Sequence, residues 1–262
     1  MSSAYAIPKL APFKSFASRD PLLYPDSDGE PMADNDQQYQ TMVDLRFGLQ
    51  HKYRDQDVYV GANLLIYFEE GDPTKRIAPD VFVSLGVPRG ARRTYLIWLE
   101  GKAPDVVVEI ASKRTWQADV TWKKGLYQGL GVQEYFLFDP NGEYFQPVLQ
   151  GYRLEEDSYR PMAPLETTDQ RGVLGLWSDM LGVELWAQPN VEPAMPFILR
   201  LWDIAASIWL PTPEGETLAR IEAEARAHAE AAARAEAEAR AADAETRLRN
   251  MEAELQRLRG GA

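Results

Sequence analysis

The 262-residue sequence contains no cysteine and only two histidines, His51 and His228. The absence of cysteine excludes disulfides, thiolate nucleophiles and cysteine-based zinc sites. Two histidines argue against a His-rich metal centre or a Ser-His-Asp triad. We interpret both as structural, because His51 follows an apolar helical stretch and His228 lies in an Ala-rich run. Any metal must then bind mainly through carboxylate oxygens, which favours magnesium or manganese.

Positive charge is also scarce, because 28 Lys and Arg residues stand against 40 Asp and Glu residues and the formal net charge is -12. This balance argues against non-specific binding of polyanions, since contacts with phosphates need Lys and Arg. No apolar run is long enough to span a bilayer, and the beginning MSSAYAIPKL lacks the apolar region of a signal peptide. We therefore expect a cytoplasmic protein without a membrane partner.

The length of 262 residues is enough for one domain with a sizeable core and an appendage. The composition divides the chain into four parts. Residues 1–35 are rich in Pro, Ser and Asp and predict an extended lead-in. Residues 36–190 begin with a predicted helix, capped by Asn35 or Asp36, and continue as short apolar runs separated by turns. Residues 191–213 predict a hairpin or linker.

The fourth part, residues 214–259, consists almost entirely of Ala, Glu and Arg with charges at helical spacing, which predicts a long helix. In the earlier part of this helix, the positions that would face a partner in a coiled coil are mostly Ala, which packs weakly. A solvated single helix is therefore one interpretation. We favour self-association into a homo-oligomer, most simply a dimer, because the larger apolar side chains need cover. These side chains follow the 3-4-3 spacing of a short coiled coil: Leu248, Met251, Leu255 and Leu258.

The apolar runs of the central part predict short strands together with helices, which is typical of the α/β class. The run APDVVVEIAS has almost no polar alternation, which is typical of a strand covered on both faces. A strand or helical turn is expected over 93–102, a helix over 115–130, and a short helix or strand pair over 174–186. Strands or hairpins are expected over 58–73, 77–88, 103–112, 134–145, 149–162 and 198–213.

Acidic residues recur in two strand-like units, APDVFVSLG and APDVVVEIA. Asp105 and Glu109 share a strand face but lie roughly 13 Å apart, because a strand advances about 3.3 Å per residue. If the two units pair antiparallel, Asp80 lies near Glu109 or Ala111, and one hard cation between the Asp80 and Glu109 carboxylates would offset their repulsion. If they pair parallel, Asp80 lies beside Asp105 instead.

The predicted helix after the second unit carries a lysine toward the sheet. A buried, unpaired ammonium is costly, so Lys123 needs an anionic partner such as Glu109. The alternative is a simple i,i+4 pair with Asp119, which contributes only a few tenths of a kcal/mol. At 100° per residue, one face of this helix forms a stripe that Lys124 does not share. The stripe comprises Trp116, Val120, Lys123, Tyr127 and Leu130.

Basic residues flank these acids in the sequence. They could contact phosphates despite the acidic total, because clustering matters more than net charge. Solvated loop charges are the alternative interpretation. The residues are Lys75, Arg76, Arg89, Arg92, Arg93, Lys113 and Arg114.

The run PDVVVEIASKRT, followed in order by Asp, Lys, Tyr and LGVQEYFLFDP, resembles the Uma2 family of "putative restriction endonucleases", which is assigned to the PD-(D/E)xK nuclease superfamily. The segments YPDSDGEPMADND and VYVGANLLIYFEEG and the Ala/Glu/Arg tail are similar to a bacterial branch of that family. The resemblance implies a restriction-endonuclease-like core, a mixed four-stranded sheet flanked by helices whose first strands pair antiparallel. It therefore favours the pair of Asp80 and Glu109.

By this resemblance, Asp80 is the motif aspartate and Glu109 the (D/E), and both would bind Mg2+, with Mn2+ as the alternative ion. The lysine expected two residues after the acid is missing, because Ala111 stands there. The resemblance therefore points to Lys123, which would orient or activate the attacking water or neutralise the transition state. Asp105 and Glu30 are additional candidates.

The function implied by the resemblance is a magnesium-dependent endonuclease that hydrolyses DNA phosphodiester bonds. The alternative is a catalytically weak or inactive nuclease fold that binds DNA or assembles through its C-terminal helix. The long helix and the acidic total favour that alternative. Cleavage assays separate the two.

Overall fold

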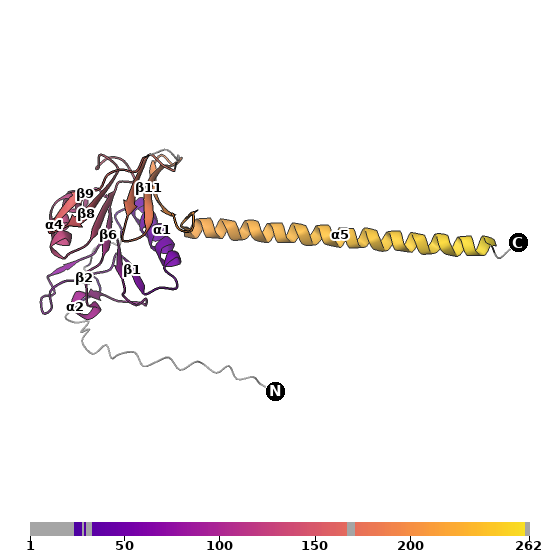
Figure 1. The fold of residues 1–262 in the computed structure, drawn as a ribbon, viewed down its shortest axis with the longest axis horizontal. Coiled ribbons are helices and arrows are strands. Elements are labelled where there is room, and N and C mark those ends of the chain that lie inside the picture. The colour runs from indigo at the N-terminus through magenta and orange to yellow at the C-terminus, as the bar shows by residue number, and fades with distance from the viewer. Residues whose placement is uncertain (1–23, 28, 30–32, 167–170, 260–262) are drawn as a thin grey trace, which may run out of the picture. The chain divides into compact units, whose positions relative to one another are not determined.

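The computed structural model describes residues 24–27, 29, 33–166 and 171–259, and the chain divides into two units, 1–212 and 213–262 (Figure 1). Most of the lead-in expected over residues 1–35, including Glu30, lies outside the described residues. None of the helices in the described ranges is long and apolar enough to cross a bilayer. The two units are described in turn.

The first long element is the helix α1, Asp36–Lys52, and the predicted cap is confirmed. The side chain of Asn35 accepts a hydrogen bond from the backbone N–H of Gln38 at 2.8 Å, which satisfies a free donor of the first turn. The helix buries Leu45 and Leu49 against Val58 and neighbouring valines of the main sheet. The buried side of α1 also includes the polar residues Gln38 and Thr41, so its packing against the sheet does not follow a strict apolar stripe.

The main sheet is mixed and has the strand order β1-β4-β6-β7-β8-β9. Only β6 and β7 pair parallel, and a helical crossover joins them, as parallel neighbours require. The sheet has six strands rather than the expected four, because the hairpin predicted over 149–162 adds β8 and β9 to one side. The strands are β1 Val58–Ala62, β4 Val81–Leu85, β6 Val106–Ile110, β7 Glu134–Phe138, β8 Leu149–Glu155 and β9 Ser158–Pro161.

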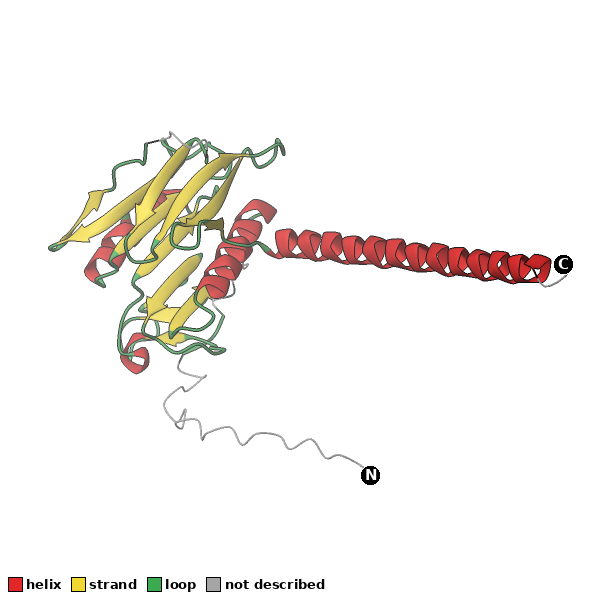
Figure 2. Cartoon of the chain, turned by 45° about the vertical axis from the view of Figure 1, so that its right-hand side comes forward, coloured by secondary structure: helices red, strands yellow, loops and turns green. Residues whose placement is uncertain are grey.

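Two smaller sheets complete the first unit (Figure 2). The sheet β10-β11-β12-β13 shares a core cluster with α1 and the main sheet. The expected hairpin or linker, 191–213, therefore contributes β12 to a sheet that begins in the preceding segment. The strands of this sheet are β10 Leu174–Ser178, β11 Val183–Pro189, β12 Phe197–Asp203 and β13 Ile208–Trp209. The strands of the third sheet, in spatial order, are β3 Arg76–Ile77, β2 Ile66–Tyr67 and β5 Tyr95–Leu96. The helix α2, Ile97–Glu100, directly follows β5 in the chain.

The helix expected over 115–130 is divided into α3, Trp116–Val120, and α4, Trp122–Gly129. The division lies at Thr121, whose φ of -117° and ψ of -101° leave the helical region. The carbonyl of Asp119 accepts a hydrogen bond from the hydroxyl of Tyr135 at 2.8 Å instead of continuing a regular helical ladder. A tertiary contact from β7 therefore accompanies the break that local periodicity did not indicate.

The α4 side of the main sheet has its own core. Tyr127 of α4 packs with Val107 of β6 and Tyr135 of β7, while α1 and the four-stranded sheet cover the other face. All residues of β6 are buried, which confirms the prediction of a strand covered on both faces.

The second unit is the helix α5, Pro213–Arg259, which confirms the predicted long helix. The side chains from Glu214 to Ala253 are exposed. Ion pairs at i,i+4 spacing, such as Arg240 with Glu236 at 2.9 Å, support the helix without a core.

Candidate active site where β4 begins and β6 ends

Strand register brings two predicted acids together. The strands β4 and β6 pair antiparallel with Val81 opposite Val108, so the next residues in each direction, Asp80 and Glu109, lie opposite one another. The backbone N–H of Asp80 points to Glu109 Oε2 at 3.4 Å. The antiparallel pairing on which the Asp80–Glu109 prediction depended is therefore confirmed.

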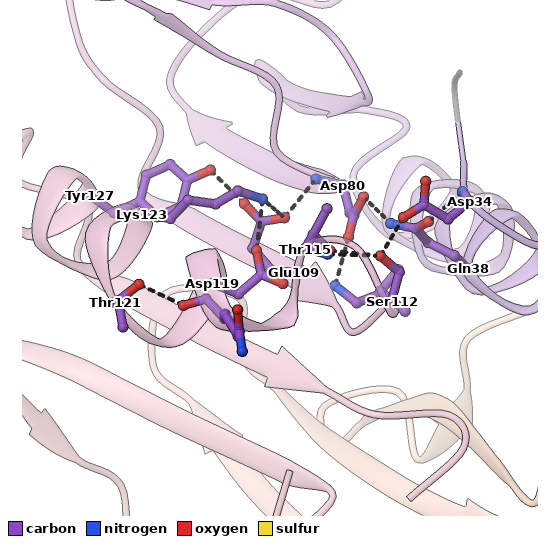
Figure 3. Close-up of polar contacts among 12 residues, drawn as sticks. Asp34, Gln38, Asp80, Glu109, Ser112, Thr115, Asp119, Thr121, Lys123 and Tyr127 are labelled. Atoms are coloured by element: carbon purple, nitrogen blue, oxygen red, sulfur yellow. Dashed lines mark hydrogen bonds and ion pairs between the residues drawn. The ribbon is translucent and has the colours of Figure 1, made fainter. Parts of the chain in front are cut away.

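Asp80 is held by donors from two elements. Gln38 of α1 donates from Nε2 to Oδ1 at 2.8 Å, and the backbone N–H of Ile110 donates to Oδ2 at 2.7 Å (Figure 3). Burial raises the pKa of the Asp80 carboxyl well above its usual value, and the neighbouring Glu109 carboxylate raises it further. The carboxyl is thus fixed in position, but its ionised form is disfavoured by burial and by the nearby Glu109 carboxylate.

Glu109 is almost completely buried, with 1% of its surface exposed. The hydroxyl of Tyr127 donates to Oε1 at 2.6 Å, and Lys123 Nζ lies 3.1 Å from Oε2. Both partners come from α4 and face the sheet, as Figure 3 shows. The inward direction predicted for Lys123 from helical spacing is confirmed.

Lys123 also contacts Asp119 of α3, whose Oδ1 lies 2.7 Å from its Nζ. Burial lowers the pKa of Lys123, but the carboxylates of Glu109 and Asp119 outweigh burial and raise it above the usual value. Burial and then the Glu109 carboxylate raise the pKa of Asp119, and against the lowering effect of Lys123 the pKa reaches about 7. The two interpretations of Lys123, a pair with Glu109 or with Asp119, therefore hold at the same time.

Comparison with known proteins gives one family. The model described as "Uma2: Putative restriction endonuclease" matches residues 29–180, more than half of the chain. The chain belongs to the Uma2 family. No curated protein matches it. A solved structure titled as a putative nuclease belonging to DUF820, from Anabaena variabilis, is 19% identical, with 53% of this chain and 76% of that chain covered at a TM-score of 0.39. That likeness carries no argument about the site.

The buried acids of this Uma2 chain have the chemistry of a hard-cation site. Asp80, Glu109 and Asp119 offer only carboxylate oxygens, the ligands that Mg2+ and Mn2+ prefer. When all three are ionised they exceed the single ammonium of Lys123 by two charges, which a divalent ion would offset. Neither carboxylate oxygen of Asp119 has a well-aligned hydrogen-bond donor among the described residues, despite the close ammonium. The residues present therefore fit such an ion.

The described residues do not by themselves form a complete ligand shell for a metal ion. Within the described ranges, no three acidic or histidine side chains converge on one point. This is compatible with Mg2+, which usually keeps several waters and takes only one or two carboxylates from the protein. Asp80 and Glu109, joined by strand register, are the residues that would hold it.

The remaining predicted candidates lie elsewhere. Asp105 stands before β6, at the end of that strand opposite to Glu109, where it accepts a hydrogen bond from the backbone N–H of Leu85 and pairs with Lys102, both at 2.7 Å. It is not brought to the acidic group. Glu30 lies outside the described residues.

Three of the flanking arginines are engaged by acids of the protein. Arg92 pairs with Glu100 at 2.8 Å, Arg93 pairs with Asp26 at 2.7 Å, and Arg114 pairs with Asp34 at 2.8 Å. These pairs favour a structural role for much of the basic cluster.

Three residues of the site were not among the predicted site residues. Asp119 and Tyr127 were visible as neighbours of Lys123 on the helical pattern, at spacings of four residues on either side. Gln38 carried a weaker signal, as a polar side chain on the buried side of α1. Its distance of 42 residues from Asp80 meant that only the tertiary structure revealed the contact.

Proposed function

We propose that this Uma2 protein is a divalent-cation-dependent endonuclease that hydrolyses DNA phosphodiester bonds, with Mg2+ as the resident ion and Mn2+ as a substitute. The observation that carries the proposal is the buried group of three carboxylates and one lysine where β4 begins and β6 ends. The family description, restriction endonuclease, supports DNA as the substrate.

Asp80 and Glu109 would hold the ion, and their neighbours keep both carboxylates in position. When bound, such an ion lowers the pKa of a coordinated water and offsets charge on phosphate oxygens. Gln38 and the backbone N–H of Ile110 orient Asp80, and Tyr127 orients Glu109. Each carboxylate oxygen retains lone-pair capacity after these hydrogen bonds.

Lys123 is the residue that would stabilise developing negative charge. Its ammonium lies 3.1 Å from Glu109 and 2.7 Å from Asp119, and its three N–H groups give it the capacity to donate to a phosphate oxygen as well. A fixed positive charge in a buried site stabilises a transition state more strongly than a solvated one. The position two residues after Glu109 is occupied by the fully buried Ala111, and α4 supplies the ammonium in its place.

A second candidate function is assembly through α5 by a nuclease fold without activity. The observation that favours it is the set of apolar side chains that are exposed on this helix. They are Leu218, Ile221, Leu248 and Met251. Cleavage and oligomeric state are separate measurements, so the two candidates can be distinguished.

The test of the proposed nuclease is a plasmid cleavage assay with Mg2+ or Mn2+ and with EDTA. Glu109→Gln and Lys123→Met are expected to cut about 10²–10³-fold more slowly, and EDTA should stop cleavage. Lys124→Met is the matched control for Lys123→Met, because Lys124 is the adjacent lysine and lies 3.3 Å from the Tyr152 ring centroid, away from the acids. Asp105→Asn is the matched control for Glu109→Gln, because it also replaces a carboxylate by an amide but at a position away from the acidic group.

Equal cleavage by the wild type and both site variants would overturn the site assignment. Absence of cleavage of any DNA by the folded wild type, with either metal ion, would overturn the nuclease and favour assembly.

A further inference from the structure

A pocket with a volume of about 400 Å³ lies between α1, the end of β1 and residues 90–92. Its size is within the usual range for small-ligand sites. Since β1 is the first strand of the main sheet, the pocket lies at a sheet edge rather than beneath a layer. This pocket is separate from the acidic group described above, and the proposed hydrolysis does not use its side chains.

The pocket adjoins Asp80 through two of its lining residues. Asn63, which lines the pocket, donates its backbone N–H to the carbonyl of Asp80 at 3.1 Å. Tyr39, on the opposite wall, directly follows Gln38, whose side chain is hydrogen-bonded to the Asp80 carboxylate. The pocket is therefore linked to Asp80 through the backbone of Asn63 and through the residue next to Gln38, although Asp80 is not one of its described lining residues.

The lining combines aromatic rings with positive charge. Tyr39 and Phe47 contribute rings, and Tyr39 is 51% exposed, whereas the ring of Tyr59 is buried beneath the Arg92 guanidinium. Among the residues that the structure describes, the charged ones in the lining are Arg46 and Arg92. Because the described lining contains no acid and Arg92 is paired with Glu100, the charge of Arg46 favours an anionic ligand.

The two arginines differ in their availability. The guanidinium of Arg92 lies 4.0 Å from the ring centroid of Tyr59 and is paired with Glu100. These contacts within the protein leave Arg92 less able to bind a ligand. Arg46 is exposed and makes no ion pair within the part of the chain that the structure describes. Arg46 is therefore the residue that can meet a phosphate at the mouth of the pocket.

We propose that this pocket binds one unpaired nucleotide of the substrate strand, with its base against the aromatic rings and its phosphate at Arg46. Aromatic stacking with a nearby arginine is the usual way in which proteins hold single-stranded nucleic acid. Base pairs in an intact duplex cannot enter such a pocket. The inference rests on the proposed nuclease for its substrate, and it specifies single-stranded or locally unpaired DNA as the preferred class.

The test is binding of fluorescently labelled DNA to the full chain in EDTA, measured by fluorescence anisotropy at one ionic strength. The probes are a short oligothymidylate, a duplex hairpin with the same number of phosphates, and a strand of abasic deoxyribose phosphates of the same length. The wild type is expected to bind oligothymidylate about tenfold more tightly than either other probe. Tyr39→Ala and Arg46→Ala should each lose most of that preference.

Arg54→Ala is the matched control, because it removes one positive charge from an exposed residue that does not line the pocket. It should change the affinity for every probe by less than about twofold. Equal binding of oligothymidylate and the abasic strand by the wild type would overturn the pocket, as would equal losses in Arg46→Ala and Arg54→Ala.

The outcomes also separate the pocket from the nuclease. If the wild type cleaves DNA but Tyr39→Ala and Arg46→Ala bind like the wild type, the pocket is wrong and the nuclease stands. If the pocket variants lose single-strand preference but the wild type cleaves nothing, the binding site stands and the nuclease is wrong.

Discussion

Lys123 lies between two buried carboxylates, and this single side chain connects the helical region to the sheet. Removal of one partner from a buried ion pair is costly because it leaves an uncompensated charge. Glu109 would retain the hydroxyl of Tyr127, but Asp119 would lose its close cation. Loss of activity in Lys123→Met should therefore be compared with its unfolding curve, and the neighbouring Lys124→Met provides the reference.

A second charged pair, Lys52 with Asp203, links α1 to β12 at 2.6 Å. Burial raises the pKa of Asp203, but the hydrogen bond from Lys52 and two backbone N–H groups outweigh burial, so the pKa lies below its usual value. A carboxylate with a lowered folded-state pKa stabilises the protein above its unfolded-state pKa near 3.9, and this contribution is lost as the pH falls through the folded-state value.

Lys52→Met is expected to lower the free energy of unfolding by about 1 kcal/mol at about pH 7, with a smaller loss below about pH 4. Urea unfolding followed by tryptophan fluorescence checks this, because all seven tryptophans precede residue 213 and report on the first unit. Arg54→Met, in an exposed pair, should leave the curve unchanged. A loss of the same size at every pH would contradict the charge argument.

The element that positions the lysine is α4, and its sequence is not optimal for a helix. Gly125 lies inside α4, is exposed and has nothing within 4 Å of the place where a Cβ would stand. Gly131, just after the helix, has a φ of +77°, which L side chains rarely adopt. The two glycines therefore have opposite requirements although both are open to solvent.

Gly125→Ala is expected to raise the free energy of unfolding by about 0.5–1 kcal/mol, because alanine is the better helix former. Gly131→Ala is its counterpart and should lower the free energy of unfolding by about 1–2 kcal/mol, since a Cβ is strained at positive φ. Urea unfolding measures both. Destabilisation by Gly125→Ala would show that α4 needs the freedom of glycine at this position.

At the scale of the whole molecule, the chain consists of a packed unit and a helix without a core of its own. Over residues 214–253, whose side chains are described, α5 is exposed, and local ion pairs and a high alanine content support it. Leu248 and Met251 are 58% and 61% exposed. We infer that a second copy of α5 covers these side chains.

The Leu248→Lys and Met251→Lys double variant is expected to convert a dimer into a monomer, because two charges at an apolar seam repel their counterparts. Light scattering after size-exclusion chromatography measures the mass of the full chain. Thr246→Lys with Asn250→Lys adds the same charge to the other side of the helix and should remain dimeric. A wild-type mass equal to one chain would exclude self-association through α5 under those conditions.

The sequence by itself determined the elements and several of their directions. Capping by Asn35, the apolar run of β6 and the composition of α5 depend on neighbours along the chain, which is why these predictions were confirmed. The inward direction of Lys123 followed from helical periodicity for the same reason. The family resemblance added the choice of Asp80, which residue spacing had left open.

The tertiary structure decided which distant residues meet. The contact between Gln38 and Asp80 requires α1 to pack beside β4. The main sheet has six strands rather than the expected four, because β8 pairs with β7 and β9 pairs with β8. The break at Thr121 accompanies a hydrogen bond from Tyr135 on another element. Local sequence sets backbone preferences, whereas such contacts depend on how buried surfaces fit together, and no short stretch of sequence specifies that fit.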